Sequence, residues 1–512
     1  MTAFEFAPLP AVHTEDRFRE FLQRLDGYFE TVNQSRTQLS WAKIWHEPYD
    51  SDAQERIDQA SDLLYSASHH ETIQEWKDKA RDPYVKRWAE VLDRDFVLAR
   101  LEQQPDLRKI VNHISDRYLG WRPKVDGQEV SYTRQTWIFR HEADREIRRK
   151  AWVAFEELGE ELKDITREMF QLRNEGARKL GYSTYADLKL QLADDVSRQW
   201  LVDRFTEMET VTEPVFVGYL QRQADREGLS EVQPWDVQYL LDRDPWVDLC
   251  YFPAERLQEN LFACAASLGL DSAALGIRLY WYDSAFGGQC MSCAPQDIRV
   301  MISKGDGMLY YNTAYHEYGH ALHSAYNDQP FTLRRESGLF VEGMAMFMEQ
   351  FLHYPSWLLK MGVPGAEIDR YRETRKLPRM YRHRRLAATV MAELAAWDDP
   401  TQDLNQVFGE TTRRYLSASF QPRPFAAVTR WTWPVRLQSY FIADLIASQT
   451  HAFLRSHFSP IFDKPDAIGH VRDHYWRPGN SIPWLEKIRR CTGKDLAYDD
   501  LGLEMTGPLP DA

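Results

Sequence analysis

A His-Glu-x-x-His pattern, made by His316, Glu317 and His320, is the part of the sequence best suited to chemistry. On a helix, residues four apart lie one turn apart on the same side, so both imidazoles can bind one metal ion. Imidazole nitrogens are typical zinc ligands. Glu317 then lies beside the ion, placed to act as a base on water bound to it. The pattern therefore predicts a hydrolytic zinc site.

A catalytic zinc site needs a third protein ligand and an open fourth position. Residues 327–330 should end the motif helix, and an apolar helical run follows over residues 339–349. Glu342 lies in that run, where an unpaired carboxylate would be costly to bury. We expect Glu342 to be the third ligand, with a carboxylate on a solvated stripe as the alternative. Glu349, two turns further along the same face, is expected to accept the free N–H of a ligand histidine.

His323 also lies on the motif face, but it is two turns from His316 and therefore too far away to share the ion. Two interpretations stay open for this side chain. It contacts a metal ligand or the substrate, or it is a core histidine whose hydrogen bonds are satisfied within the fold.

Several blocks of the sequence resemble known zinc peptidases. His-Glu-x-Gly-His-x-Leu-His over residues 316–323, followed by Phe-Val-Glu at 340–342 and another Glu seven residues later, is similar to the thimet oligopeptidase and oligoendopeptidase F family. Residues 172–182 are similar to a segment shared by that family and the angiotensin-converting enzyme family. Residues 440–445 and 483–486 are more similar to the converting-enzyme side.

This resemblance implies a mostly α-helical, zincin-type fold of the gluzincin class. Its two lobes would surround a deep cleft, with one small β-sheet next to the zinc helix. It further implies one Zn²⁺ per chain and a short peptide or peptide-like molecule as the substrate.

The resemblance also assigns roles around residue 440. Tyr440 begins the block in which a converting-enzyme tyrosine donates to the oxyanion; the alternative is a half-buried tyrosine on a helix. Arg430 stands where that family has a histidine, and residues 430–436 replace a loop rich in Gly and Tyr in the oligopeptidases. We expect Arg430 and Arg436 to contact the substrate. For Arg430, a clamp on a substrate carboxylate is favoured over a transition-state donor.

Residues 297–303 form the clearest predicted strand, because Ile298, Val300 and Ile302 alternate with polar or long side chains. The motif helix follows this strand closely. We expect the strand to have a free edge near Ile298 and Val300 that pairs with an extended peptide and carries its scissile carbonyl to the metal. An ordinary strand in a small sheet is the alternative.

Composition and charge narrow the class of protein. The 512 residues are 43% hydrophobic and 27% charged, as in ordinary globular proteins. A net charge of −14 argues against nucleic acid and anionic membranes as partners. Neither a signal peptide nor a run of ~18 apolar residues is apparent, so no membrane association is expected. The predicted location is the cytoplasm.

Helical periodicity extends through most of the chain, and Gly120 with Pro123 marks a break. We expect residues 1–120 to form an N-terminal helical region that covers the cleft, as the resemblance implies. Residues 121–512 are expected to form the helical catalytic region that contains the zinc site.

Three functions fit these observations. The favoured one is zinc-dependent hydrolysis of peptide bonds in short peptides, of oligopeptidase or peptidyl-dipeptidase type, with Glu317 activating a zinc-bound water. The second is a specialised amide hydrolase of the same fold that acts on a peptide-like metabolite in a biosynthetic pathway. The third is a non-catalytic zinc-binding relative, against which the intact Glu317 argues. The sequence leaves the bond specificity and the oligomeric state open.

Overall fold

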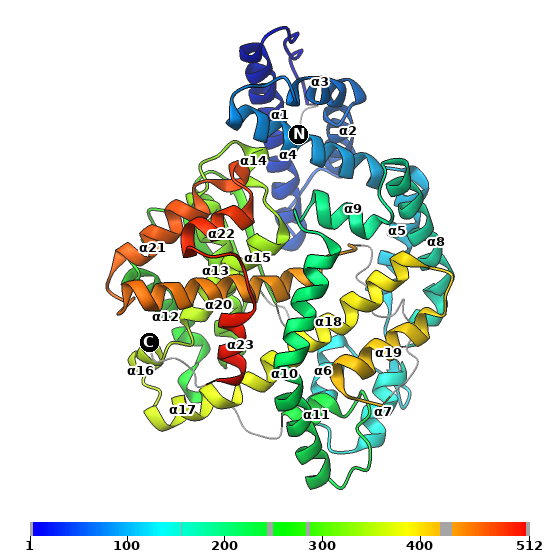
Figure 1. The fold of residues 1–512 in the computed structure, drawn as a ribbon, viewed down its shortest axis with the longest axis vertical. Helices are drawn as coiled ribbons and strands as arrows, with labels where there is room; N and C mark the ends of the chain where they lie inside the picture. Colours follow the sequence, from blue (N-terminus) through cyan, green and yellow to red (C-terminus); the bar gives the residue numbers. More distant parts are fainter. Residues whose placement is uncertain (1–3, 155, 243–248, 283–286, 420–432, 508–512) are drawn as a thin grey trace.

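The computed structural model describes residues 4–154, 156–242, 249–282, 287–419 and 433–507. Helices dominate these residues, which also contain one two-stranded and one three-stranded sheet (Figure 1). The mostly α-helical fold class expected from the sequence is confirmed. No helix in the described ranges is long and apolar enough to cross a membrane.

The N-terminal helices have a hydrophobic core of their own. The first five helices are α1 (Glu15–Ile44), α2 (Ala53–Leu64), α3 (Ala67–Lys77), α4 (Pro83–Glu102) and α5 (Pro105–Gly120). Phe18, Trp88 and Phe96 lie in the core shared by α1 to α4. Helix α5 packs into the main core instead, through Leu107 and Ile114. Core membership therefore changes near the end of α4, where Leu101 already belongs to the main core, while the division at residue 120 stays a prediction.

The N-terminal helices are fixed to the rest of the chain through the short helix α14 (Phe331–Arg334). Asp26 of α1 accepts hydrogen bonds from the backbone N–H groups of Phe331 and Thr332 at 2.8 and 2.7 Å. The Thr332 hydroxyl donates to the same carboxylate at 2.6 Å and accepts from the Trp88 indole at 2.7 Å. Because these groups are buried and mutually satisfied, they hold α1 and α4 against the segment that follows the motif helix.

In the described residues between α5 and the larger sheet, a hairpin is followed by a series of α-helices. The hairpin is β1 (Lys124–Val125) and β2 (Gln128–Glu129), and the helices are α6 (Tyr132–His141), α7 (Arg145–Ala154), α8 (Glu157–Lys179), α9 (Tyr185–Leu192), α10 (Arg198–Arg226), α11 (Val237–Leu241) and α12 (Leu257–Ser267). Helix α8 buries Leu158, Leu162 and Met169, spaced as one apolar helix face requires. The Thr184 hydroxyl caps α9 by accepting from the backbone N–H of Asp187.

The larger sheet consists of β3 (Ile277–Tyr282), β4 (Gly288–Ala294) and β5 (Asp297–Ser303), in the order β3-β5-β4. Strand β5 pairs parallel with β3 and antiparallel with β4. The expectation of a free edge near Ile298 and Val300 is therefore wrong. Both side chains point into the core, with exposed fractions of 2% and 0%, so they are not placed to contact a substrate.

The edge strand beside the motif helix is β4. A Cβ atom on Gly288 would lie 2.6 Å from Glu317 Cγ and 2.7 Å from Thr313 Cγ2, so the strand backbone lies directly on the helix that carries the motif. The sequence Gly-Gln-Cys-Met-Ser-Cys-Ala contains no β-branched residue, which is why periodicity did not identify this strand.

The C-terminal half is helical. It contains α13 (Met308–Tyr326), α14, α15 (Gly338–Phe351), α16 (Pro355–Lys360), α17 (Gly365–Thr374), α18 (Lys376–Asp398), α19 (Leu404–Leu416), α20 (Gln438–Phe458), α21 (Pro465–Val471), α22 (Trp484–Thr492) and α23 (Asp499–Thr506). Helices α13, α15 and α20 lie next to one another (Figure 1). Gly319 permits this close approach, since a Cβ there would lie 2.6 Å from the Met344 carbonyl oxygen of α15.

Candidate metal centre

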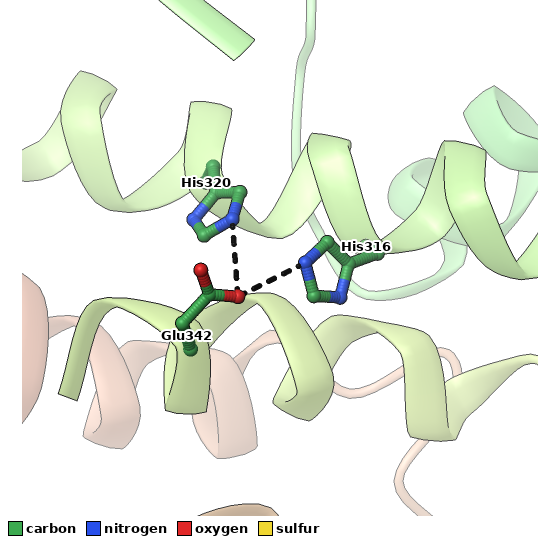
Figure 2. Close-up of side chains that lie close together, drawn as sticks. All are labelled: His316, His320 and Glu342. Carbon is green, nitrogen blue, oxygen red and sulfur yellow. Dashed lines mark ion pairs between the residues drawn. The ribbon is translucent and has the colours of Figure 1, made fainter. Parts of the chain in front are cut away.

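His316 and His320 on α13 face Glu342 on α15 (Figure 2). The Glu342 Oε2 atom lies 3.3 Å from His316 Nε2 and 3.8 Å from His320 Nε2. One ligand atom from each residue lies within 4.8 Å of the other two. The structure thus brings together the three side chains that the sequence singled out as metal ligands.

Local sequence explains why these side chains meet. Helix α15 starts at Gly338, where the Ser337 hydroxyl accepts a hydrogen bond from the backbone N–H of Leu339 at 3.2 Å. Glu342 follows one turn into the helix. Gly343 lies against Ile446 of α20, and Gly319 lies against α15, so small residues on both helices allow the close packing. The three side chains of the candidate metal site therefore lie on packed helices and not on loops.

The donor set fits a divalent cation. Glu342 Oε2 is buried and has no hydrogen-bond partner within the described residues, although it faces two imidazole nitrogens. A buried carboxylate oxygen without a donor is costly, and a cation bound among the three side chains would satisfy it. Two imidazoles and one carboxylate are also a ligand set that zinc commonly takes in hydrolases.

Burial and mutual charge shift the pKa values of the cluster in opposite directions. Burial opposes a charged His316, but the carboxylates of Glu342 and Glu349 outweigh it and raise the pKa of His316 to about 10. Burial and the neighbouring His316 lower the pKa of His320 to about 3. Burial raises the pKa of Glu317 to about 7. These opposite shifts follow from the close approach of two imidazoles and the carboxylates in a buried space.

Glu317 lies between α13 and the edge strand β4. Its side chain is 8% exposed, and its carboxylate accepts a hydrogen bond from the backbone N–H of Cys290. Gly288 in β4 leaves the space that the carboxylate occupies, since an added Cβ would lie 3.0 Å from Glu317 Oε1. The strand thus fixes the orientation of the side chain that sequence reasoning assigned as the base.

The two side chains expected near the ligands lie in different environments. Glu349 Oε2 is 3.4 Å from His316 Nδ1, so Glu349 contacts the nitrogen that faces away from Glu342. His323 Nε2 instead contacts Glu336 Oε1 at 2.7 Å. The second oxygen of Glu336 accepts from the buried ammonium of Lys487. His323 therefore belongs to a buried ion network separate from the metal cluster.

The residues expected to contact substrate are only partly described. Arg436 Nη2 lies 3.8 Å from Glu342 Oε1, next to the metal cluster. Tyr440 lies in the first turn of α20, partly buried against the main core, and its role stays a prediction. Arg430 lies outside the described residues.

A cavity of about 590 Å³ adjoins the metal cluster. Helices α4 and α9, the start of α15 and the residues just before α20 line it, and Glu342 forms part of its wall. Sequence reasoning singled out the segment 430–436, which contains Trp433, but it did not find Lys189 or Asp194, which also line the cavity. These two residues lie far before the motif along the chain and match no known pattern, so no sequence signal joined them to the site.

Comparison with known proteins adds a separate observation. Residues 138–268 match the family model of peptidase family M3. The comparison with curated proteins found no match. The matched segment ends before α13, so it is independent of the His-Glu-x-x-His pattern and of the metal cluster. The specific resemblances to oligoendopeptidase F and to the converting enzyme stay predictions. The match supports a metallopeptidase of family M3, and with it a hydrolase that acts on peptides.

Proposed function

We propose that this protein is a zinc-dependent peptidase that cleaves peptide bonds in short peptides. His316, His320 and Glu342 hold the zinc ion, and Glu317 is the general base. The observation that carries the proposal is the buried Oε2 atom of Glu342, which has no hydrogen-bond partner among the described residues and faces both imidazoles. The Glu317 carboxylate, held by the Cys290 N–H, lies beside this group.

When bound, zinc supplies Lewis-acid chemistry, which polarises a scissile carbonyl and makes water acidic enough to attack it at neutral pH. Glu317 takes a proton from the attacking water and delivers it to the leaving amine. The backbone N–H of Cys290 holds the Glu317 carboxylate in place during this transfer. Glu349 accepts the Nδ1 proton of His316, which leaves Nε2 free to bind the ion.

The edge strand β4 provides a mode of substrate binding. It pairs with β5 on one side, and no strand pairs with its other edge within the described residues. An extended peptide added to that edge would run beside Glu317, since Gly288 and Cys290 both contact this carboxylate. This geometry favours short, extended peptides over folded proteins.

Metal analysis combined with Glu317→Gln tests the proposal. Purified protein should contain one equivalent of zinc and cleave members of a mixed peptide library. The Gln variant should keep the zinc, because Glu317 is not a ligand, and lose ~10²–10⁴-fold in kcat. Cleavage by the variant at the normal rate would refute the assigned base. Absence of zinc from active protein would refute the assigned metal.

A specialised amide hydrolase that uses the same residues is the second candidate. Trp433 and Arg436 line the cavity where the related oligopeptidases have a Gly-rich loop, and this observation favours an unusual substrate. Zinc-loaded protein that cleaves no peptide of a broad library would favour this candidate over the first.

A further inference from the structure

The charged residues around the cavity are mostly paired with one another. Arg94 contacts Asp195 at 2.8 Å, and Arg335 contacts Asp95 at 3.1 Å. The other acidic side chains of the lining also have partners. Glu102 accepts from Arg173 and Tyr185, and Glu336 contacts His323 and Lys487. Asp194 accepts from Ser337 and Gln438, and Glu342 faces His316.

Two cations of the lining are not engaged in this way. The Lys189 ammonium has no hydrogen bond or ion pair with any described residue, although its charge favours the ionised forms of Glu102 and Asp194. Arg436 has one nearby carboxylate, Glu342 at 3.8 Å, and the proposed zinc ion would neutralise that charge. Its side chain is 48% exposed. Both cations remain available to an anionic ligand.

The backbone before Arg436 is held in a conformation that its sequence disfavours. Val435 has φ of 54°, in the left-handed region that β-branched residues avoid. Its N–H donates to Glu393 Oε1 at 2.7 Å, and its carbonyl accepts from Gln438 Nε2 at 2.8 Å. Such strain persists where surrounding bonds enforce it, and it is common at ligand clamps. Here the enforced turn places Arg436 beside the metal ligand Glu342.

The surroundings of the Arg436 guanidinium favour a carboxylate as its partner. It lies over the indole ring of Trp433, 5.2 Å from the ring centroid. A guanidinium in a cation–π contact keeps N–H groups at its edge that match the two oxygens of a carboxylate. Trp433 is itself 66% exposed at the cavity, so it offers apolar surface to the same ligand.

We propose that the cavity binds a carboxylate of the substrate through Arg436, with Lys189 adding positive charge to the same space. The substrate class is then an acidic peptide or peptide-like amide whose carboxylate lies close to the scissile bond. This inference rests on the proposed function. The carboxylate is supplied either by the C-terminus of the peptide or by an aspartate or glutamate side chain.

Binding to zinc-loaded Glu317→Gln protein tests the inference without turnover. The probes are three forms of one acetylated, alanine-rich hexapeptide: the free acid, the C-terminal amide, and the amide with one internal aspartate. Calorimetry should show the free acid or the aspartate form binding ~10–100-fold more tightly than the plain amide. The form that is preferred identifies the source of the carboxylate.

Substitutions assign the preference to residues. In the Glu317→Gln background, Arg436→Gln should remove the preference for the peptide with a carboxylate. Lys189→Met in the same background should reduce this preference about threefold or more. Arg490→Gln and Lys109→Met are matched controls, because both side chains are exposed and neither lines the cavity, and they should leave the preference unchanged. In the active enzyme, Arg436→Gln should raise KM for the preferred peptide with kcat little changed.

The outcomes separate this inference from the proposed function. Equal binding of all three peptides would overturn the carboxylate site, as would a preference that survives both substitutions. Carboxylate-dependent binding without cleavage by the zinc-loaded wild-type enzyme would refute the peptidase and keep the site. Cleavage without any carboxylate preference would support the peptidase and overturn the carboxylate site.

Discussion

Two histidines of helix α13, His323 and His316, each contact a buried carboxylate from another segment. The two contacts differ in which groups balance the charge of the carboxylate. In the pair His323 and Glu336, one oxygen of Glu336 lies 2.7 Å from His323 and the other accepts from the buried Lys487 ammonium. In the pair His316 and Glu342, the oxygen that faces the imidazoles has no hydrogen-bond partner within the described ranges.

The difference shows what separates a structural ion network from a metal site. Lys487 is 0% exposed, lies over the Phe340 ring at 3.8 Å, and supplies from the chain itself the cation that Glu336 needs. Among the described residues, no lysine or arginine contacts the Glu342 oxygen that faces His316 and His320, and Arg436 lies at the far oxygen. A buried carboxylate is stable when its charge is matched, and under the proposed function a zinc ion from solution matches the charge of Glu342.

The largest expected difference between the two pairs is in metal loading. Glu342→Gln should lose zinc and hydrolysis together, with a loss of affinity well beyond the ~100-fold typical of residues that act through a ligand. Glu336→Gln should keep one zinc ion per folded chain. Metal analysis after dialysis against a weak chelator measures both. Loss of zinc from the Glu336 variant alone would invert the assignment.

Folding stability should show the opposite order. Glu336→Gln leaves the fully buried Lys487 without its carboxylate, which should lower the free energy of unfolding by ~3–5 kcal/mol. Glu342→Gln, compared with wild type after chelation of both, should lower it by less than Glu336→Gln does, because its inner oxygen has no hydrogen bond to lose. Urea unfolding followed by circular dichroism compares them. Equal losses would mean that both carboxylates serve the fold.

The sequence predicted one pair better than the other for a physical reason. His316, His320 and Glu342 were found because helical spacing and an acidic residue in an apolar run are local signals. The role of His323 stayed open because Lys487, which completes its network, is 151 residues from Glu336 along the chain. The helical fold class followed from periodicity, whereas the strand order did not, because β4 lacks the residues that mark a strand.

A smaller effect concerns the nitrogen of His316 that does not face the ion. Glu349→Gln should weaken zinc binding by ~10–100-fold, because the amide interacts less strongly than a carboxylate with the imidazole Nδ1–H at 3.4 Å. Competition with a chromogenic chelator measures the affinity. Glu486→Gln, at a partly exposed carboxylate on α22, serves as the control. An affinity unchanged by Glu349→Gln would leave this residue with a packing role.

The last expected effect is the pH dependence of the stability that the Lys487 network contributes. Burial opposes the ionised form of Glu336, but Lys487 and His323 outweigh it and hold the pKa of this carboxyl below its usual value of 4.5. A carboxyl with a lowered pKa in the folded state stabilises the fold above its unfolded pKa and loses that contribution as the pH falls.

The difference in free energy of unfolding between wild type and Glu336→Gln should therefore be constant from neutral pH to about pH 5 and then narrow, by ~1.4 kcal/mol for each unit of pKa difference. At low pH a protonated Glu336 and a glutamine leave Lys487 in the same position, so the two proteins should converge. A gap that persists to pH 3 would show that Glu336 is not ionised in the folded protein, and the contrast with Glu342 would then rest on hydrogen bonding alone.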